Sequence, residues 1–454
     1  MKVLKILGIV LVLLVVLLIA GAVWVNHYLQ SPEFKQFALG AARKAVGTEI
    51  KVSDFSVSPF SGVSLKGVAI ANPEGFSNQL LTADAFVLRY RLLPLLRRQV
   101  VIDELSLQKP NIQLVRGDKG RWNYEPLTEQ PTPAGTSSEA PKPKPETSPT
   151  PSSTTRGSYD LLLSKLTMTD GNLVMVNEKN QELLKVQNIN LSSSVDWTGG
   201  RLSGSGKASI ELLDVANSLM LRQVASPLRF STNEIALASL SGKLAGGTIS
   251  GNITVNVLDG LKYVVNLQVK DSDVDTLLQE AHTKRVVNGK LQATTALTGT
   301  SGLPTIVGNG HAEVVGGKLS DIPLLNQLSL LLQVPALKDL KFEECRLEFS
   351  LSNNVMQTPV IRLISPQVQI TGTGSVNLAD YTLNHDMTLA LAESTLAIIP
   401  PQIRAIFHRR ADGFLTVDFH VGGPYDSPKT DLPKRLVKGA AEQFLKSEFQ
   451  KLIK

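Results

Sequence analysis

The sequence predicts a mainly β protein, in which an N-terminal transmembrane helix precedes an elongated, curled antiparallel β-sheet with a groove-like form. Two observations predict this class. Apolar and polar residues alternate with a period of two over most of the 454 residues, and Gly or Pro interrupts the alternation at turn-like positions. Stretches of helical periodicity are short and few, so we expect a few short helices and an amphipathic helix at the C-terminus.

The transmembrane helix is expected within residues 1–30. Lys2 and Lys5 precede an uncharged run from Ile6 to Val25. A helix of that length spans about 30 Å, the thickness of the hydrocarbon core of a bilayer. The flanking lysines favour a cytoplasmic N-terminus, so that the rest of the chain is exported. The alternative is a cleaved signal peptide with Ala20-Gly21-Ala22 as its cleavage site, although the apolar region of a signal peptide is normally shorter.

Residues 31–127 are expected to form an N-terminal α+β portion of the groove. A helix begins at Pro32, after the capping residue Ser31, and ends at Gly47. Alternation then predicts strands to the end of this portion. Within it, the basic and apolar stretch Leu88–Arg98 is expected to be a helical turn between strands, with a contact to anionic headgroups as the alternative.

Residues 128–156 are predicted to be a disordered linker. They contain seven prolines among Ser, Thr, Lys and Glu. Such a segment cannot bury enough apolar area to offset its ordering entropy, so it behaves as an extended spacer.

Residues 157–432 are predicted to form an elongated β-groove domain. Its clearest hairpin has Asp259-Gly260 between the alternating runs Ile253–Val257 and Tyr263–Val269. Asp-Gly tolerates the positive φ that tight hairpin turns require.

Three helical segments are expected in the second half of the chain. Two are short, at Leu324–Gln333 and at Ser394–Arg410, where two prolines interrupt the second. The third is a basic amphipathic helix over residues 433–454.

The sequence shows no group of reactive residues with the spacing of a catalytic or metal site. The six histidines and the single cysteine, Cys345, show no metal-ligand spacing. Gly204–Ser209 lacks the first glycine and the magnesium-binding hydroxyl of a phosphate-binding loop, and Asp271–Asp275 opens a calcium-like loop without its glycine or closing Glu. We therefore expect no enzyme activity, no metal and no cofactor. The net charge of +6 is too mild to favour nucleic-acid binding.

Each alternating strand has one apolar and one polar face. The few helices cannot cover the apolar face of so many strands. Either the sheet folds over on itself as a sandwich, or the face is left for a guest. Next to a membrane we expect that guest to be a phospholipid or another acyl-chain lipid, because each buried methylene contributes about 0.8 kcal/mol. The candidate lipid-contacting residues are Val255, Val257, Val265, Leu267, Leu347, Phe349, Leu351, Val368, Ile370, Val417 and Phe419.

Several segments, taken in order, resemble the AsmA family of bacterial envelope proteins. They are the N-terminal anchor, Leu81–Leu96, Ile102–Leu114, Gly120-Arg-Trp-Asn-Tyr124, Gly316–Leu319, Leu324–Leu332, Leu340–Phe342, Leu347–Leu351 and Gly372–Leu378. The resemblance implies a single-pass protein of the bacterial inner membrane with its bulk in the periplasm, similar in build to chorein-type bridge-like lipid transfer proteins. It implies a role in outer-membrane biogenesis and phospholipid movement, and it implies no catalytic residue.

A second function remains open. The protein could instead be a non-lipid scaffold that assists assembly of outer-membrane proteins, with its C-terminal helix contacting an envelope protein partner. The same helix could equally cap an open edge of the sheet, which long sheets need.

Overall fold

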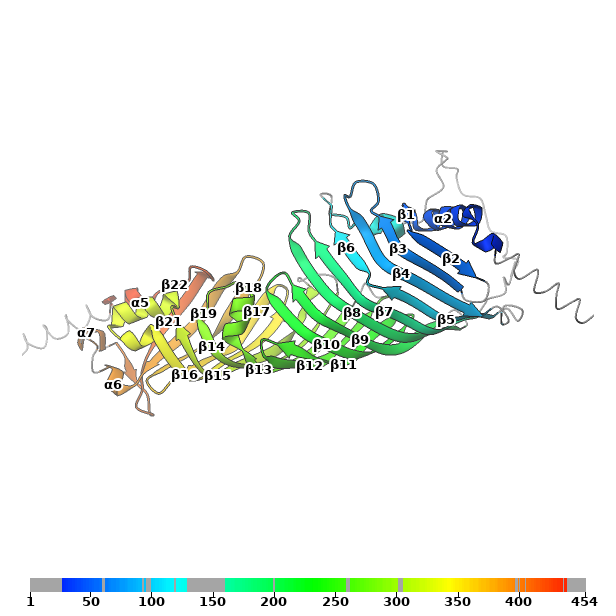
Figure 1. Cartoon of the computed structure of the whole chain (residues 1–454). Helices are drawn as coiled ribbons and strands as arrows, with labels where there is room; N and C mark the ends of the chain where they lie inside the picture. The colour runs from blue at the N-terminus through cyan, green and yellow to red at the C-terminus, as the bar shows by residue number, and fades with distance from the viewer. Residues whose placement is uncertain are drawn as a thin grey trace, which may run out of the picture. The chain divides into compact units, whose positions relative to one another are not determined.

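The computed structural model describes residues 27–58, 62–91, 94, 99–117, 120–128, 160–198, 201–258, 262–300, 305–396, 399, 401–404, 406–435 and 437–438. The chain divides into two compact units. Unit 1 holds residues 1–212 and 230–232, and unit 2 holds residues 213–229 and 233–454. Each unit is mainly β, with long, curled strands and few helices (Figure 1).

Unit 1 is built on a mixed sheet. Its strands are β1 (Ile50–Lys51), β2 (Asp54–Ser58), β3 (Gly62–Ala71), β4 (Gln79–Arg91), β5 (Gln99–Gln108), β6 (Asn111–Val115), β7 (Asp160–Val176), β8 (Glu182–Thr198) and β9 (Arg201–Val215). Strands β1 and β2 both pair with β3, β3 pairs with β4, and β4 pairs with both β5 and β6, always antiparallel. Strand β7 pairs antiparallel with β8.

The sheet of unit 1 differs from the all-antiparallel sheet that the sequence predicts, because β7 runs parallel to β5 and β6. The parallel register extends from the pair Gln99 and Asp160 to the pair Val115 and Val176. Parallel neighbours need a crossover connection of a dozen or more residues. The predicted linker lies within this connection, so it joins neighbouring strands of unit 1, and the division between the units falls at residue 212.

Unit 2 is an antiparallel meander. Its strands are β10 (Leu219–Ser231), β11 (Glu234–Leu244), β12 (Gly247–Asn256), β13 (Lys262–Asp273), β14 (Val287–Gly299), β15 (Val307–Ser320), β16 (Asp339–Ser352), β17 (Val355–Ile364), β18 (Val368–Asn377), β19 (Thr382–Leu391), β20 (His408–Arg409), β21 (Leu415–Pro424) and β22 (Lys429–Thr430). From β11 to β19 each strand pairs with the next along the chain. Strand β21 then pairs with β19, and the two-residue strands β20 and β22 pair with β21. The hairpin predicted around residues 259–260 is confirmed as β12 and β13.

The described helices are short and occur where the sequence pattern changes. They are α2 (Pro32–Val46), α3 (Glu125–Thr128), α4 (Val274–Glu280), α5 (Pro323–Leu332), the 3-10 turn η3 (Pro335–Leu337), α6 (Glu393–Leu396) and α7 (Pro401–Arg404). Helix α2 has its predicted caps. The Phe34 amide donates to Ser31 Oγ at 3.2 Å, and Gly47 takes a φ of 80°. Helix α5 confirms the prediction for Leu324–Gln333.

Two helical predictions are wrong in part. Leu88 and the three residues that follow belong to β4, because Leu88 pairs with Val63 on one side and with Leu105 on the other. Among the described residues of the segment Ser394–Arg410, the helical ones belong to the single turns α6 and α7. The segment ends in β20, where His408 and Arg409 pair with β21.

Within the described ranges, no helix is both long and apolar enough to cross a membrane. The expected anchor at residues 6–25 lies outside those ranges, as does nearly all of the predicted linker. At the predicted C-terminal helix, residues 432–435 and 437–438 are helical, and the remainder lies outside the described residues.

Candidate functional site

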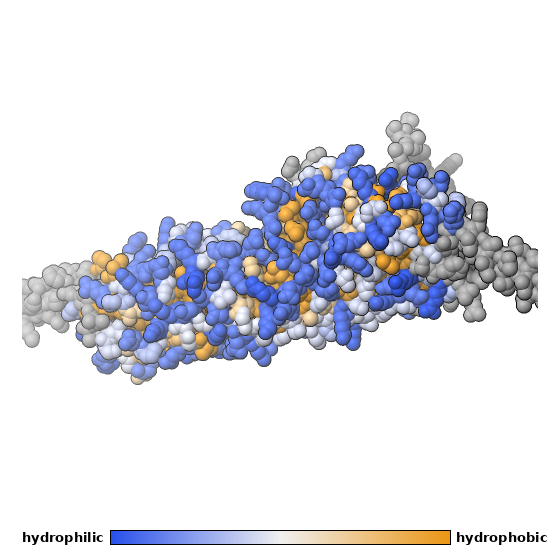
Figure 2. Space-filling view, in the orientation of Figure 1, coloured by the Kyte–Doolittle hydropathy of each residue, from blue (hydrophilic) through white to orange (hydrophobic). Residues whose placement is uncertain are grey.

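In unit 1, large apolar side chains from five strands form a continuous row on one face of the sheet. Leu65, Phe86, Leu107, Met168 and Leu191 are successive cross-strand partners. Partners of this kind lie side by side on the same face. All five are only half-buried, although β4, β5 and β7 are interior strands of the sheet. Figure 2 shows apolar side chains at the surface over β3 and β4.

Unit 2 repeats this arrangement across eight strands. Successive partners from β12 to β19 are Ile253, Val265, Leu297, Gly308, Leu351, Met356, Val376 and Leu383. Each of these residues is half-buried. We call the face of each unit's sheet that carries such a row its apolar face.

All the strand residues predicted to contact lipid lie on the apolar face of unit 2. Val265 and Leu351 belong to the row itself, and β16 keeps its alternation without a bulge opposite β15, so that Leu347 and Phe349 share the face of Leu351. Val255, Leu267, Val368, Ile370, Val417 and Phe419 fall on this face by the same alternation. Val257 follows directly after the end of β12.

Three of the predicted residues are covered by protein. Val368, Phe419 and Val417 are 0%, 2% and 6% exposed and belong to one core cluster. The cluster includes Leu325, Leu328 and Leu332 from α5 and Leu337 from η3, so this segment packs over the apolar face near β18, β19 and β21 (Figure 1). These three side chains fill the core there and leave no surface for a ligand.

Ile370 is half-buried and packs against the same cluster. The other seven predicted residues lie outside the cluster and are half-buried: Val255, Val257, Val265, Leu267, Leu347, Phe349 and Leu351. A large apolar side chain at the interior of a covered sheet is normally fully buried. Part of each of these side chains therefore remains accessible.

The opposite face of unit 2 is polar. On this face a second row of successive cross-strand partners consists of Asn266, Ala296, Asn309, Ser350, Gln357, Ser375 and Asn384. Asn266 Nδ2 donates to Asn252 Oδ1 at 3.0 Å, and Lys318 forms an ion pair with Asp339 at 2.9 Å. This face is therefore suited to contact with water, and its row of polar residues contrasts with the row on the apolar face.

A polar pair interrupts the apolar face next to its covered part. His385 Nε2 and Thr358 Oγ1 lie 3.0 Å apart, and both side chains are buried. Burial lowers the pKa of His385 because it disfavours the charged imidazolium, and the nearby His420 acts in the same direction. Cys345 packs against the same core cluster, and burial raises the pKa of its thiol.

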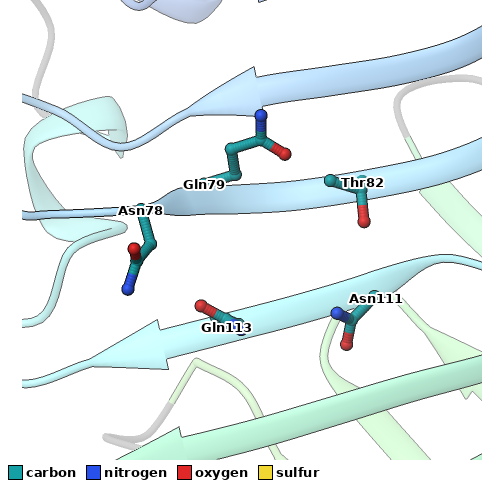
Figure 3. Close-up of a pocket in the computed structure, with 5 residues that line it drawn as sticks. All are labelled: Asn78, Gln79, Thr82, Asn111 and Gln113. Atoms are coloured by element: carbon teal, nitrogen blue, oxygen red, sulfur yellow. The ribbon is translucent and has the colours of Figure 1, made fainter.

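Unit 1 also carries a polar pocket that the sequence did not predict. Its volume is about 520 Å³, and Asn78, Gln79, Thr82, Asn111 and Gln113 line it (Figure 3). In the sequence these polar residues look like part of an ordinary solvated surface. Only the register of β4 against β6, which pairs Thr82 with Asn111, brings them together.

The part of the chain that the structure describes contains no group of three or more His, Cys, Asp or Glu side chains able to hold a metal ion.

Comparison with known proteins gives one match. The model of the AsmA family matches residues 1–211. The matched region contains the segments Leu81–Leu96, Ile102–Leu114 and Gly120–Tyr124, on which the resemblance rests in this half of the chain. The corresponding resemblance of residues 316–378 lies beyond the match and stays a prediction. Neither the curated proteins nor the solved structures contain a match to the chain.

Proposed function

The chain belongs to the AsmA family by its residues 1–211, and we propose that it binds or conducts phospholipids along the apolar face of its sheet. The proposal sets this activity in the periplasm and in outer-membrane biogenesis. The observation that carries it is the set of large apolar side chains that stay half-buried at the interior of each sheet, such as Phe86 in unit 1 and Phe349 in unit 2.

The dimensions of the row in unit 2 suit acyl chains. Its eight strands are separated by seven spacings of about 4.8 Å, so the row is about 34 Å long. The hydrocarbon core of a bilayer, about 30 Å thick, holds two acyl chains end to end. The row therefore has room for two chains in line.

The apolar side chains of the row suit an acyl chain that moves along them. Covering a methylene contributes about 0.8 kcal/mol wherever it lies along the row. The eight residues of the row carry no ionisable group that would fix a headgroup at one point. A chain can therefore be held by many equivalent contacts and still slide.

The proposal also assigns residues 6–25 the role of an uncleaved anchor in the inner membrane, with the N-terminus in the cytoplasm. The mass of the protein extracted from membranes tests this directly. Retention of Met1 supports the anchor, whereas loss of about twenty residues from the N-terminus supports a cleaved signal peptide.

Site-specific photo-cross-linking tests lipid binding in the full chain. A photoreactive phenylalanine analogue replaces Phe349 on the apolar face or Ser350 on the polar face, and mass spectrometry identifies the adducts. We expect phospholipid adducts at residue 349 and none at residue 350. Comparable adducts at both, or protein adducts alone at residue 349, would count against the proposal, and the second result would favour the scaffold function.

Charge substitutions supply a matched pair in a single strand. Val265 lies on the apolar face and its neighbour Val264, 41% exposed, lies on the other. Val265→Glu or Leu267→Glu should lower the yield of lipid adducts at residue 349 by at least about tenfold, because a carboxylate in a hydrocarbon contact costs several kcal/mol. Val264→Glu and Gln268→Glu should leave the yield unchanged.

A further inference from the structure

The polar pocket of unit 1 carries an inference that is independent of lipid binding. Asn78 and Gln79 stand at the start of β4, Thr82 lies within β4, and Asn111 and Gln113 belong to β6 (Figure 3). Thr82 and Asn111 are cross-strand partners, and the adjacent partners Leu81 and Ile112 point to the opposite face. The pocket therefore opens on the face of the sheet opposite Leu81 and Ile112.

The described residues that line the pocket are neutral and able to form hydrogen bonds. They supply four carboxamides and one hydroxyl, and none of these five residues is ionisable. Within the described structure none of these five side chains forms a hydrogen bond to another residue. Each carboxamide offers two N–H donors and an acceptor oxygen, and the hydroxyl offers one donor and acceptor sites. The pocket thus presents donors and acceptors in close alternation.

A buried asparagine fixes the walls of the pocket. Asn123 is 0% exposed, and its Nδ2 donates to the backbone oxygen of Gln113 at 2.8 Å and to Asn72 Oδ1 at 2.7 Å. Its Oδ1 accepts from the Val115 amide at 3.1 Å. Asn72 in turn donates to the backbone oxygen of Ser77 at 2.6 Å, next to Asn78. Both sides of the pocket are therefore tied to one buried side chain, which preorganises the site.

This chemistry selects among ligand classes. An anion would need Lys or Arg and a cation would need carboxylates, and the described lining residues supply neither. An apolar group would desolvate four carboxamides without replacing their hydrogen bonds. A hydroxyl donates and accepts at once, so a ring with several neutral hydroxyls matches the lining. The volume of about 520 Å³ lies within the usual range of ligand sites, about 300 to 1,000 Å³.

We infer that this pocket binds sugar residues of a neutral glycan. A peptide fits less well, because an added strand needs an unpaired sheet edge. At the pocket β4 already pairs with β6, and Asn123 occupies the backbone groups of Gln113 and Val115.

The test uses the full chain in a zwitterionic detergent without a sugar headgroup, so that the detergent cannot compete. The probes are N-acetylglucosamine tetramer, maltotetraose and a tetraalanine peptide, measured by saturation-transfer NMR and calorimetric titration. We expect saturable binding of at least one of the two sugars and none of the peptide. The double variant Asn111→Ala with Gln113→Ala should weaken sugar binding at least about tenfold, because it removes two of the four carboxamides.

The matched control is Gln187→Ala, which removes a carboxamide from β8 outside the pocket. It should bind sugar as the unaltered chain does. Thermal unfolding of all variants is measured alongside, and Asn111→Ala alone serves if the double variant unfolds early. Three results would each overturn the inference: no saturable signal from either sugar at millimolar concentration, unchanged affinity in the pocket variants, or preferential binding of the peptide.

Discussion

Leu105 of β5 and Leu166 of β7 are direct partners in parallel register, although the predicted linker lies between them in the sequence. The chain must return along the full length of β7, whose 17 residues span about 56 Å. Starting from Asn123, which is bonded to Val115 at the far end of the register, an extended connection needs at least about 16 residues.

This geometry predicts how far the linker can be shortened. Between Asn123 and Asp160 the chain has 36 residues (124–159). Deleting ten residues, 135–144, leaves 26 and should change the urea midpoint of unfolding little. Deleting 25 residues, 130–154, leaves 11, which reach at most about 40 Å, so β7 could not pair in register. Equal stability of the two deletions would contradict the parallel pairing.

Substitution to alanine at two positions of α5 should change the free energy of unfolding by very different amounts. Leu328 is 1% exposed within the core cluster, whereas Leu330, two residues later, is 71% exposed. Leu328→Ala should lower the free energy of unfolding by about 2 to 5 kcal/mol through lost burial and a cavity. Leu330→Ala should change it by less than about 0.5 kcal/mol. Urea unfolding of the full chain measures both, and a similar loss in both variants would mean that α5 does not seal this part of the sheet.

His385 should make unit 2 less stable in acid. Burial holds the pKa of His385 below its ordinary value, with His420 lowering it further and Asp386 opposing the shift. The unfolded chain, with an ordinary pKa of about 6.5, binds the proton first as the pH falls. Stability from this group is therefore complete above about pH 6.5 and is lost below it. Urea unfolding at pH 7.5 and pH 5.5 measures this, and His385→Gln should reduce the difference between the free energies of unfolding at the two pH values. An unaltered pH dependence in His385→Gln would contradict this assignment.

Asn123 should be critical to the stability of unit 1. Asn123→Ala removes three hydrogen bonds and leaves the partly buried Val115 amide and Gln113 carbonyl without these partners. Each such group costs about 1 to 3 kcal/mol, so we expect a loss of more than about 2 kcal/mol. The control Arg121→Ala breaks an exposed ion pair with Glu125, at 3.4 Å, and should cost at most about 1 kcal/mol. Equal effects of the two changes would show that the Asn123 network contributes little.

Local patterns in the sequence predict the elements whose determinants are themselves local. The caps Ser31 and Gly47 bound α2, and Asp259-Gly260 separates β12 from β13. Alternation likewise places Leu347 and Phe349 on one face. These features depend on backbone conformations and periodicities that a few neighbouring residues decide.

Features that depend on distant pairing could not be predicted in this way. The parallel partner of β5 lies beyond the linker, and nothing in the sequence of β5 indicates that β7 pairs with it. The cover over Val368 comes from α5, more than thirty residues earlier in the chain. The pocket joins Thr82 to Asn111 through a register that bulges can shift, so the side chains that meet there are settled only by the folded sheet.

The parallel pairing of β7 also determines the order in which strands can pair while the chain is being made. The meander of unit 2 can grow hairpin by hairpin as the chain emerges, since each strand pairs with the one just made. In unit 1 the strands up to β6 must wait for residue 176 before their open edge is matched. Until then that edge can pair with a wrong chain, so we expect the protein to need a chaperone most while the early strands of unit 1 are being made.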